Sequence, residues 1–155
     1  MRYFYLVLGA IIVSSCSHGL GSLPMSSSPQ YGYAGPLTGV QPKIKKVSAI
    51  TATQYQTIII SGSGLGTTKP YDGDSAYLQI WDKTGHWSAG LKNGSQTDSV
   101  WLDVKSWRNN KITISGFTGD YGQSYWVLHK GDKLEINVWN PQDGNGPSTK
   151  YEKVK

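Results

Sequence analysis

The sequence predicts an all-β protein in which seven to eight short strands pack as two facing sheets. Apolar and polar residues alternate with a period of two wherever a period can be read, which is typical of strands with one buried face. Gly, Asn, Asp and Pro separate these segments at short intervals, and strong helix formers are sparse after the first dozen positions. Since each strand has one apolar face, two sheets must bury those faces against each other.

The first two expected strands are rich in β-branched residues. Ile44 and Val47 indicate a first strand with a kink, and Ile50 lies behind it. A second strand is expected at 56–61, which contains three consecutive isoleucines. A glycine-rich turn and a long loop with Pro, Asp and Gly follow and continue to residue 75.

The middle of the chain shows the clearest alternation. The segments with one apolar face are 76–82, 100–105, 112–115 and 133–140. Shorter segments complete the set: an edge strand at 85–90 carrying Trp87, a short apolar stretch at 125–128, and a last strand at 148–154. Asn109 and Asn110 predict a turn, and 116–123 and 141–147 read as loops. This count of strands predicts a β-sandwich of the immunoglobulin kind, and a small barrel is the alternative.

The N-terminus reads as a secretory leader. Arg2 precedes an apolar run over 3–13, and small residues follow it. The run has about a dozen residues, whereas a membrane-spanning helix needs roughly 20. The sequence therefore predicts a cleaved signal peptide at 1–15 rather than a transmembrane anchor.

Cys16 is the only cysteine in the chain, and it stands where cleavage is expected. Val13-Ser14-Ser15-Cys16 resembles the lipobox of bacterial lipoproteins. The resemblance implies a mature chain that begins at Cys16, with acyl chains in a membrane, and two or three such chains anchor a protein stably. Ser17 in place of Asp indicates the outer membrane. The alternatives are an ordinary secreted protein with a chance cysteine and an uncleaved signal anchor.

Residues 16–41 are dominated by Gly, Ser and Pro and predict a lipidated N-terminus followed by a flexible linker. Such a linker has an r.m.s. reach of roughly 25–30 Å. The folded domain is expected at 42–155. It can contain no disulfide, because the chain has a single cysteine.

The expected domain resembles the IPT/TIG group of immunoglobulin-like domains. The resemblance covers about residues 42–154, and the motifs that carry it are Pro42-x-Ile44, the segment 58–66 with its Gly-x-Gly-Leu-Gly turn, Ile112-Thr113-Ile114-Ser115 and Val138-Trp139-Asn140. The chain departs from the family in long insertions at 70–75 and 116–128. The resemblance implies a sandwich used for binding, adhesion or spacing, and it supplies no catalytic residues.

Composition and motifs argue against several functions. The net charge is +5, but the basic residues form no stripe, so no nucleic-acid partner is expected. The chain has no G-x-S-x-G elbow, no zinc-type ligand spacing and few carboxylates outside turns. We therefore expect no enzyme and no cofactor, and an Asp→Asn change that abolished an activity would revive the enzymatic reading.

Two groups of residues are candidate binding sites. By parity, large aromatic side chains point away from the core at Tyr77, Trp81, Trp101 and Trp139. They could stack on sugar rings or anchor a protein, unless long loops fold over them and make a second core. Oxygen ligands for Ca²⁺ could come from Asp72, Asp74, Asp143 and Asn145, although turn chemistry also explains these residues.

These observations predict a lipid-anchored cell-envelope protein with a non-enzymatic binding or structural role. Its expected partners are the membrane, through the acyl chains, and an envelope protein or polysaccharide. One alternative is a carbohydrate-binding module that uses the aromatic residues. Another is an accessory subunit of a secretion or surface-appendage complex.

Overall fold

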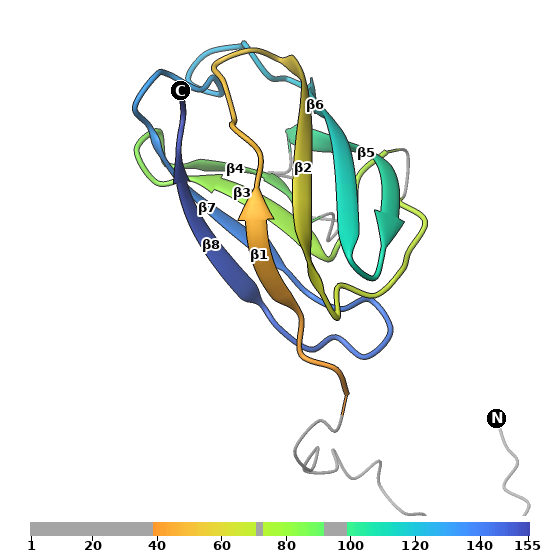
Figure 1. The fold of residues 1–155 in the computed structure, drawn as a ribbon. Coiled ribbons are helices and arrows are strands. Elements are labelled where there is room, and N and C mark those ends of the chain that lie inside the picture. The colour runs from red at the N-terminus through yellow and green to blue at the C-terminus, as the bar shows by residue number, and fades with distance from the viewer. Residues whose placement is uncertain (1–38, 71–72, 92–98) are drawn as a thin grey trace, which may run out of the picture. The chain divides into compact units, whose positions relative to one another are not determined.

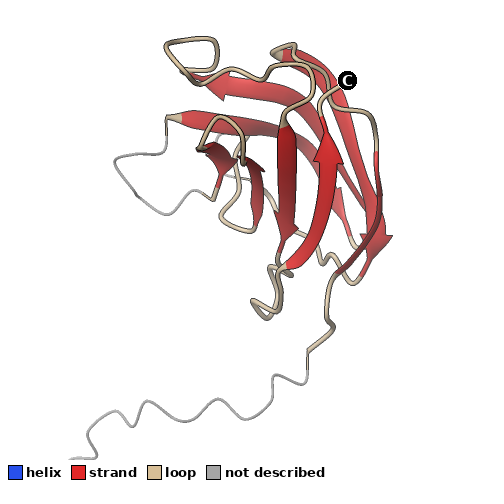
Figure 2. Ribbon diagram, turned by 90° about the vertical axis from the view of Figure 1, so that its left-hand side faces the viewer, coloured by secondary structure: helices blue, strands red, loops and turns tan. Residues whose placement is uncertain are grey.

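The computed structural model describes residues 39–70, 73–91 and 99–155, and this part of the chain is all-β. Its eight strands are β1 (Lys43–Val47), β2 (Tyr55–Ser63), β3 (Leu78–Asp82), β4 (Trp87–Gly90), β5 (Val100–Arg108), β6 (Lys111–Gly119), β7 (Lys133–Val138) and β8 (Ser148–Lys153). Figure 2 shows strands and loops in this part, and no helix. No helix that is long and apolar enough to cross a membrane occurs among these residues.

The strands form two antiparallel sheets of four, in the orders β1-β2-β6-β5 and β4-β3-β7-β8. The sheets lie one behind the other in Figure 1. In immunoglobulin domains one sheet has the order ABED and the other GFC. This chain has the same order with one strand, β4, added to the second sheet, so the predicted immunoglobulin-like sandwich is confirmed.

The core consists of the residues that alternation assigns to the inner faces. Leu78, Ile80 and Leu102 are almost completely buried, as expected, and so are Ile58 and Ile60 of β2 and both isoleucines of β6. The glycine-rich turn after β2 adds Leu65, whose backbone N–H donates to the carbonyl of Asn109 in the turn between β5 and β6. Burying a leucine side chain contributes about 1.5–3 kcal/mol, so this turn is part of the core.

Three strands extend beyond their expected ends, and β2 does so by two residues, to Ser63. β5 continues to Arg108, and this places Trp107 inside the core, where its indole N–H donates to the carbonyl of Leu65 at 2.8 Å. β6 continues through residues expected to form a loop, because its register against β2 and β5 shifts at bulges. Gly116 has a φ of 113° there, and a Cβ would overlap the carbonyl oxygen of Gln54. Glycine therefore marks a close strand approach and not the end of the strand.

The predicted leader, Cys16 and most of the predicted linker lie outside the described residues, so these remain predictions. β1 begins one residue after the expected start of the domain at 42. The first described residues lie at one end of the sandwich, and the C-terminus lies at the other end (Figure 1).

Candidate functional site

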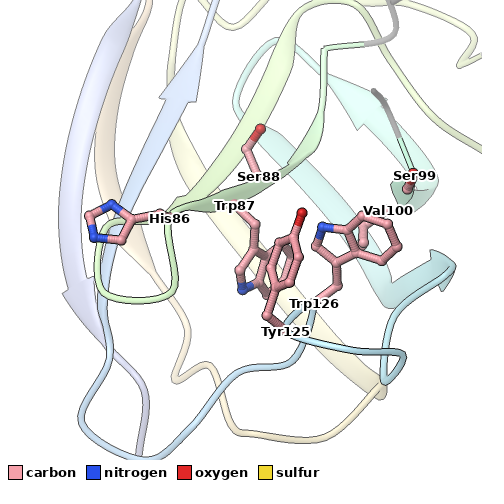
Figure 3. Close-up of a pocket in the computed structure, with 7 residues that line it drawn as sticks. All are labelled: His86, Trp87, Ser88, Ser99, Val100, Tyr125 and Trp126. Atoms are coloured by element: carbon pink, nitrogen blue, oxygen red, sulfur yellow. The ribbon is translucent and has the colours of Figure 1, made fainter. Parts of the chain in front are cut away.

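A cavity of about 470 Å³ opens between the edges of the two sheets, where β4 and β5 lie close to each other. Its walls come from the start of β4, the start of β5 and the loop 120–128. The lining residues are His86, Trp87, Ser88, Ser99, Val100, Tyr125 and Trp126. In Figure 3 the rings of Trp87, Tyr125 and Trp126 gather on one side, while His86 points away from them. We refer to this site as the aromatic pocket.

The turn between β3 and β4 positions the floor of the pocket. Asp82 accepts backbone hydrogen bonds from Thr84 at 2.9 Å and Gly85 at 3.0 Å through its Oδ1 atom. An aspartate that bonds the backbone two or three residues ahead stabilises a tight turn. β4 then pairs with β3 in register, with Trp87 opposite Asp82, and alternation directs the Trp87 indole inward.

The loop 120–128 supplies the second wall and is closed by its own backbone. Trp126 donates to the Gln123 carbonyl and accepts from Gly122. Asp120 donates to the Ser99 carbonyl, which attaches the loop to the start of β5. The Tyr125 and Trp126 rings are 5.1 Å apart at an angle of 58°, and Tyr125 is 58% exposed.

Backbone strain is concentrated around the pocket. In the described part of the chain, the non-glycine residues with positive φ are His86 at 57°, Leu91 at 56° and Ser124 at 53°. His86 lines the pocket, Leu91 follows β4, and Ser124 precedes Tyr125. Residues in this conformation cost free energy and cluster at functional sites, because the surrounding structure must hold them there.

The pocket rests on buried aromatic rings. Trp87 is 4% exposed and contacts Phe117 and Tyr121 edge-on, with centroids 6.2 and 6.0 Å apart. Phe117 and Tyr121 are stacked at 4.9 Å. The loop 120–128 therefore contributes Tyr121 to the main core of the sandwich, which also includes Trp87 and Phe117. Trp87 and Tyr121, whose sequence positions place them beside loops, belong to that core.

Acidic groups lie beneath this floor. Asp82 and Asp132 are buried. Burial raises the pKa of Asp82 above its ordinary value of 3.8, and the neighbouring Asp132 charge raises this pKa further. The two backbone hydrogen bonds to Asp82 act in the opposite direction. Burial also raises the pKa of Tyr121, although its hydroxyl accepts a hydrogen bond from Leu128. Asp82 Oδ2 and the Trp87 indole N–H have no hydrogen-bond partner among the described residues. Buried polar atoms thus lie directly beneath the pocket, and two of them have no hydrogen-bond partner among the described residues.

The four predicted aromatic residues do not form one surface. Trp81 lies on the outer face of β3, where Lys83 Nζ is 3.6 Å from its ring centroid. Tyr77 packs partly against the core, and its carbonyl accepts a hydrogen bond from Trp139. Trp101 is 39% exposed but belongs to β5, in the other sheet. None of the four lines the aromatic pocket.

The two loops that carry the predicted calcium ligands touch at Thr67, whose N–H donates to Gln142 at 2.9 Å, whereas Asp74 lies farther along its loop, against β5. Asp74 accepts from the Leu102 backbone, and Asp143 accepts from the Asn145 backbone. Asp72 lies outside the described residues. Within the part that is described, no three His, Cys, Asp or Glu side chains form a group that could hold a metal ion. The calcium site therefore stays a prediction.

Sequence reasoning missed Tyr125 and the two serines of the pocket. The available signal was the Tyr-Trp pair in a glycine-rich insertion, which places two large rings on a loop without strand alternation. It also missed Tyr151, which is 70% exposed on β8. The alternation of the last strand predicts this exposure.

No family model, curated protein or solved structure matches this chain. The residues of the pocket therefore define what it can do. Aromatic faces beside serine hydroxyls can stack on a ring and hydrogen-bond to its substituents.

Proposed function

We propose that this chain is a lipid-anchored protein of the cell envelope whose β-sandwich binds a saccharide in the aromatic pocket, without catalysis. The observation that carries the binding part is the position of Tyr125 and Trp126 beside Ser88 and Ser99 in one cavity. The anchor follows from the resemblance of Val13-Ser14-Ser15-Cys16 to a lipobox.

The pocket has the size and chemistry that a short saccharide needs. Ligand pockets typically measure about 300–1,000 Å³, and this cavity has about 470 Å³. A sugar ring presents an apolar face that can stack on Tyr125 or Trp126, and hydroxyls that can pair with Ser88 and Ser99. These groups would recognise a ring that is apolar on one face and polar at its rim.

The pocket is also preorganised. Trp87 is fixed by the Phe117–Tyr121 stack, and the loop that carries Tyr125 and Trp126 is closed by backbone hydrogen bonds. A site that is ordered before binding loses less conformational entropy when the ligand arrives. This arrangement favours binding over a structural role alone.

A glycan array and titration calorimetry with the full chain test the binding proposal. Trp126→Ala is expected to weaken binding of the selected glycan by at least about 30-fold, the equivalent of a 2 kcal/mol aromatic hot spot. Trp101→Ala is the matched control, because Trp101 is partly exposed and does not line the pocket, although its neighbour Val100 does. An equal loss in both variants, or no glycan bound by the wild type, would contradict the proposal.

Metabolic labelling with a fatty acid tests the anchor. Label in the wild-type chain and none in Cys16→Ser is the expected result, because acylation needs the thiol. Unchanged labelling in Cys16→Ser would remove the anchor from the proposal. Capture of an envelope protein by the wild type, lost in Trp126→Ala, would favour the alternative of a subunit in a larger assembly.

A further inference from the structure

A second concave site lies at the far edge of the same sheet. A groove of about 440 Å³ follows the end of the β7–β8 pair, and it is lined by Lys133, Leu134, Tyr151, Glu152, Lys153 and Lys155. β8 and β4 are the two edge strands of the order β4-β3-β7-β8. This basic groove and the aromatic pocket therefore lie on opposite edges of one sheet.

Three lysines line the basic groove, together with one carboxylate, Glu152. Lys133 and Lys153 are direct cross-strand partners in the β7–β8 ladder. Like charges directly opposite each other destabilise a sheet. Among the described residues, no salt bridge involves Lys133, Lys153 or Lys155. The fold thus holds positive charges together at a cost in stability.

Protection of the sheet edge does not explain this arrangement. Lysines on edge strands prevent strand pairing between molecules, which accounts for Lys153 on β8. Lys133 lies on β7, which already has partners on both sides. An interior strand needs no such protection. Edge protection therefore does not explain why Lys133 faces Lys153 across the ladder.

Tyr151 gives the basic groove a ring surface. It is 70% exposed and lies opposite Glu135, whose other cross-strand partner is Trp81. Glu135 forms a salt bridge with Lys83 at 3.4 Å, so its charge is already matched. The groove therefore combines an exposed aromatic face with three lysines that form no salt bridge among the described residues.

The lysines of β1 form a separate patch. β1 lies beside β8 and carries the exposed residues Lys43, Lys45 and Lys46, but the backbone N–H of Ile44 donates to Ser148, at the opposite end of β8 from the groove. Asp74, Asp82 and Asp132 are buried, so these three carboxylates are shielded from a ligand at the surface. Clustered charges of one sign raise the local concentration of oppositely charged ligands.

We propose that the basic groove binds an anionic polysaccharide, with its carboxylate or phosphate groups at Lys133, Lys153 and Lys155 and a sugar ring on Tyr151. A concave site with an exposed ring fits a chain of charged sugars better than a flat anionic membrane. The groove lies at the C-terminal end of β8, away from the end where β1 begins (Figure 1).

Affinity electrophoresis in gels containing polygalacturonate tests this proposal, with dextran as the uncharged polymer. The full chain carries Cys16→Ser, so that acylation contributes nothing. Retardation by polygalacturonate that weakens with added salt is expected. The variant with Lys133, Lys153 and Lys155 each changed to Gln is expected to bind about tenfold more weakly, which corresponds to about 1.4 kcal/mol.

A second triple variant is matched in charge, with Lys43, Lys45 and Lys46 each changed to Gln on β1. It is expected to keep most of the binding, and Tyr151→Ala is expected to lose part of it without a change in net charge. An equal loss in the two triple variants would overturn the proposal, because net charge alone would then explain binding. So would equal retardation in dextran, or sedimentation with phosphatidylglycerol vesicles that is lost in the groove variant while polygalacturonate has no effect.

Discussion

The two edges of the sheet β4-β3-β7-β8 are built differently. At the β4 edge, the aromatic pocket rests on a buried indole, strained residues and a loop closed by its own hydrogen bonds. At the β8 edge, the basic groove consists mostly of exposed side chains on a regular ladder. The difference indicates that substitutions at the first edge should affect stability and binding together, whereas substitutions at the second should separate the two.

The largest expected effect is at the floor of the aromatic pocket. Trp87→Ala removes a buried indole that contacts Phe117 and Tyr121, and it should lower the free energy of unfolding by about 3–5 kcal/mol. Urea denaturation measures the change. Trp101→Ala, at a partly exposed position, should cost far less. Similar losses in the two variants would contradict the distinction between the buried floor and the exposed outer face.

A glycine pair separates steric overlap from backbone strain at the same edge. Gly90 ends β4 with a φ of 88°, and a Cβ there would overlap the Leu78 carbonyl oxygen. Gly122 has a φ of 90°, but nothing lies within 4 Å of its Cβ position. Gly122→Ala should therefore cost only the strain of about 1–2 kcal/mol, and Gly90→Ala should cost more.

Thermal unfolding of the two glycine variants provides the measurement. Equal costs would show that the β4 edge can shift to relieve the overlap, and the pocket would then be less rigid than its contacts suggest.

The sequence predicted the layers of the fold better than its sites, for a physical reason. Alternation is local, and it assigned the inner faces of β3 and β7 correctly. Bulges interrupt alternation, so the continuation of β6 through Gly116 was missed.

The aromatic pocket is formed by residues far apart in sequence, because Ser88 and Trp126 meet only where two sheet edges approach each other. No local sequence pattern predicts that these residues lie close together. In the basic groove, the opposition of Lys133 to Lys153 depends on the register of β7 against β8, which is fixed by the hairpin as a whole.

The pH dependence of stability tests the acidic layer under the pocket. Asp82 faces Asp132 and Tyr121, and His129 Nδ1 lies 3.6 Å from Asp132. Because the folded-state pKa of Asp82 is raised, the folded protein binds this proton more tightly than the unfolded chain does. The stabilisation is complete below the ordinary value of 3.8 and is lost as pH rises through the raised pKa.

Asp82→Asn removes this proton but keeps the oxygen that accepts from Thr84 and Gly85. Its urea midpoint should vary less with pH above pH 4, and at pH 7 the variant should be at least as stable as the wild type. Asp82→Ala should also show a flatter profile but lower stability throughout, since it loses the turn. A pH profile that is unchanged in Asp82→Asn would assign the titration to another group.

The smallest expected effect is at the basic groove, and it has the opposite sign. Lys153→Gln removes one of two like charges that face each other across β7 and β8, so it should raise the free energy of unfolding by a few tenths of a kcal/mol. Lys46→Gln on β1, opposite Ser61, is the matched control and should change stability less. The gain should shrink at high salt, because screening already weakens the repulsion between Lys133 and Lys153. If the groove is a binding site that costs the fold stability, Lys153→Gln should be more stable and should bind polygalacturonate more weakly. A loss of stability in Lys153→Gln would instead mean that the lysine stabilises the strand.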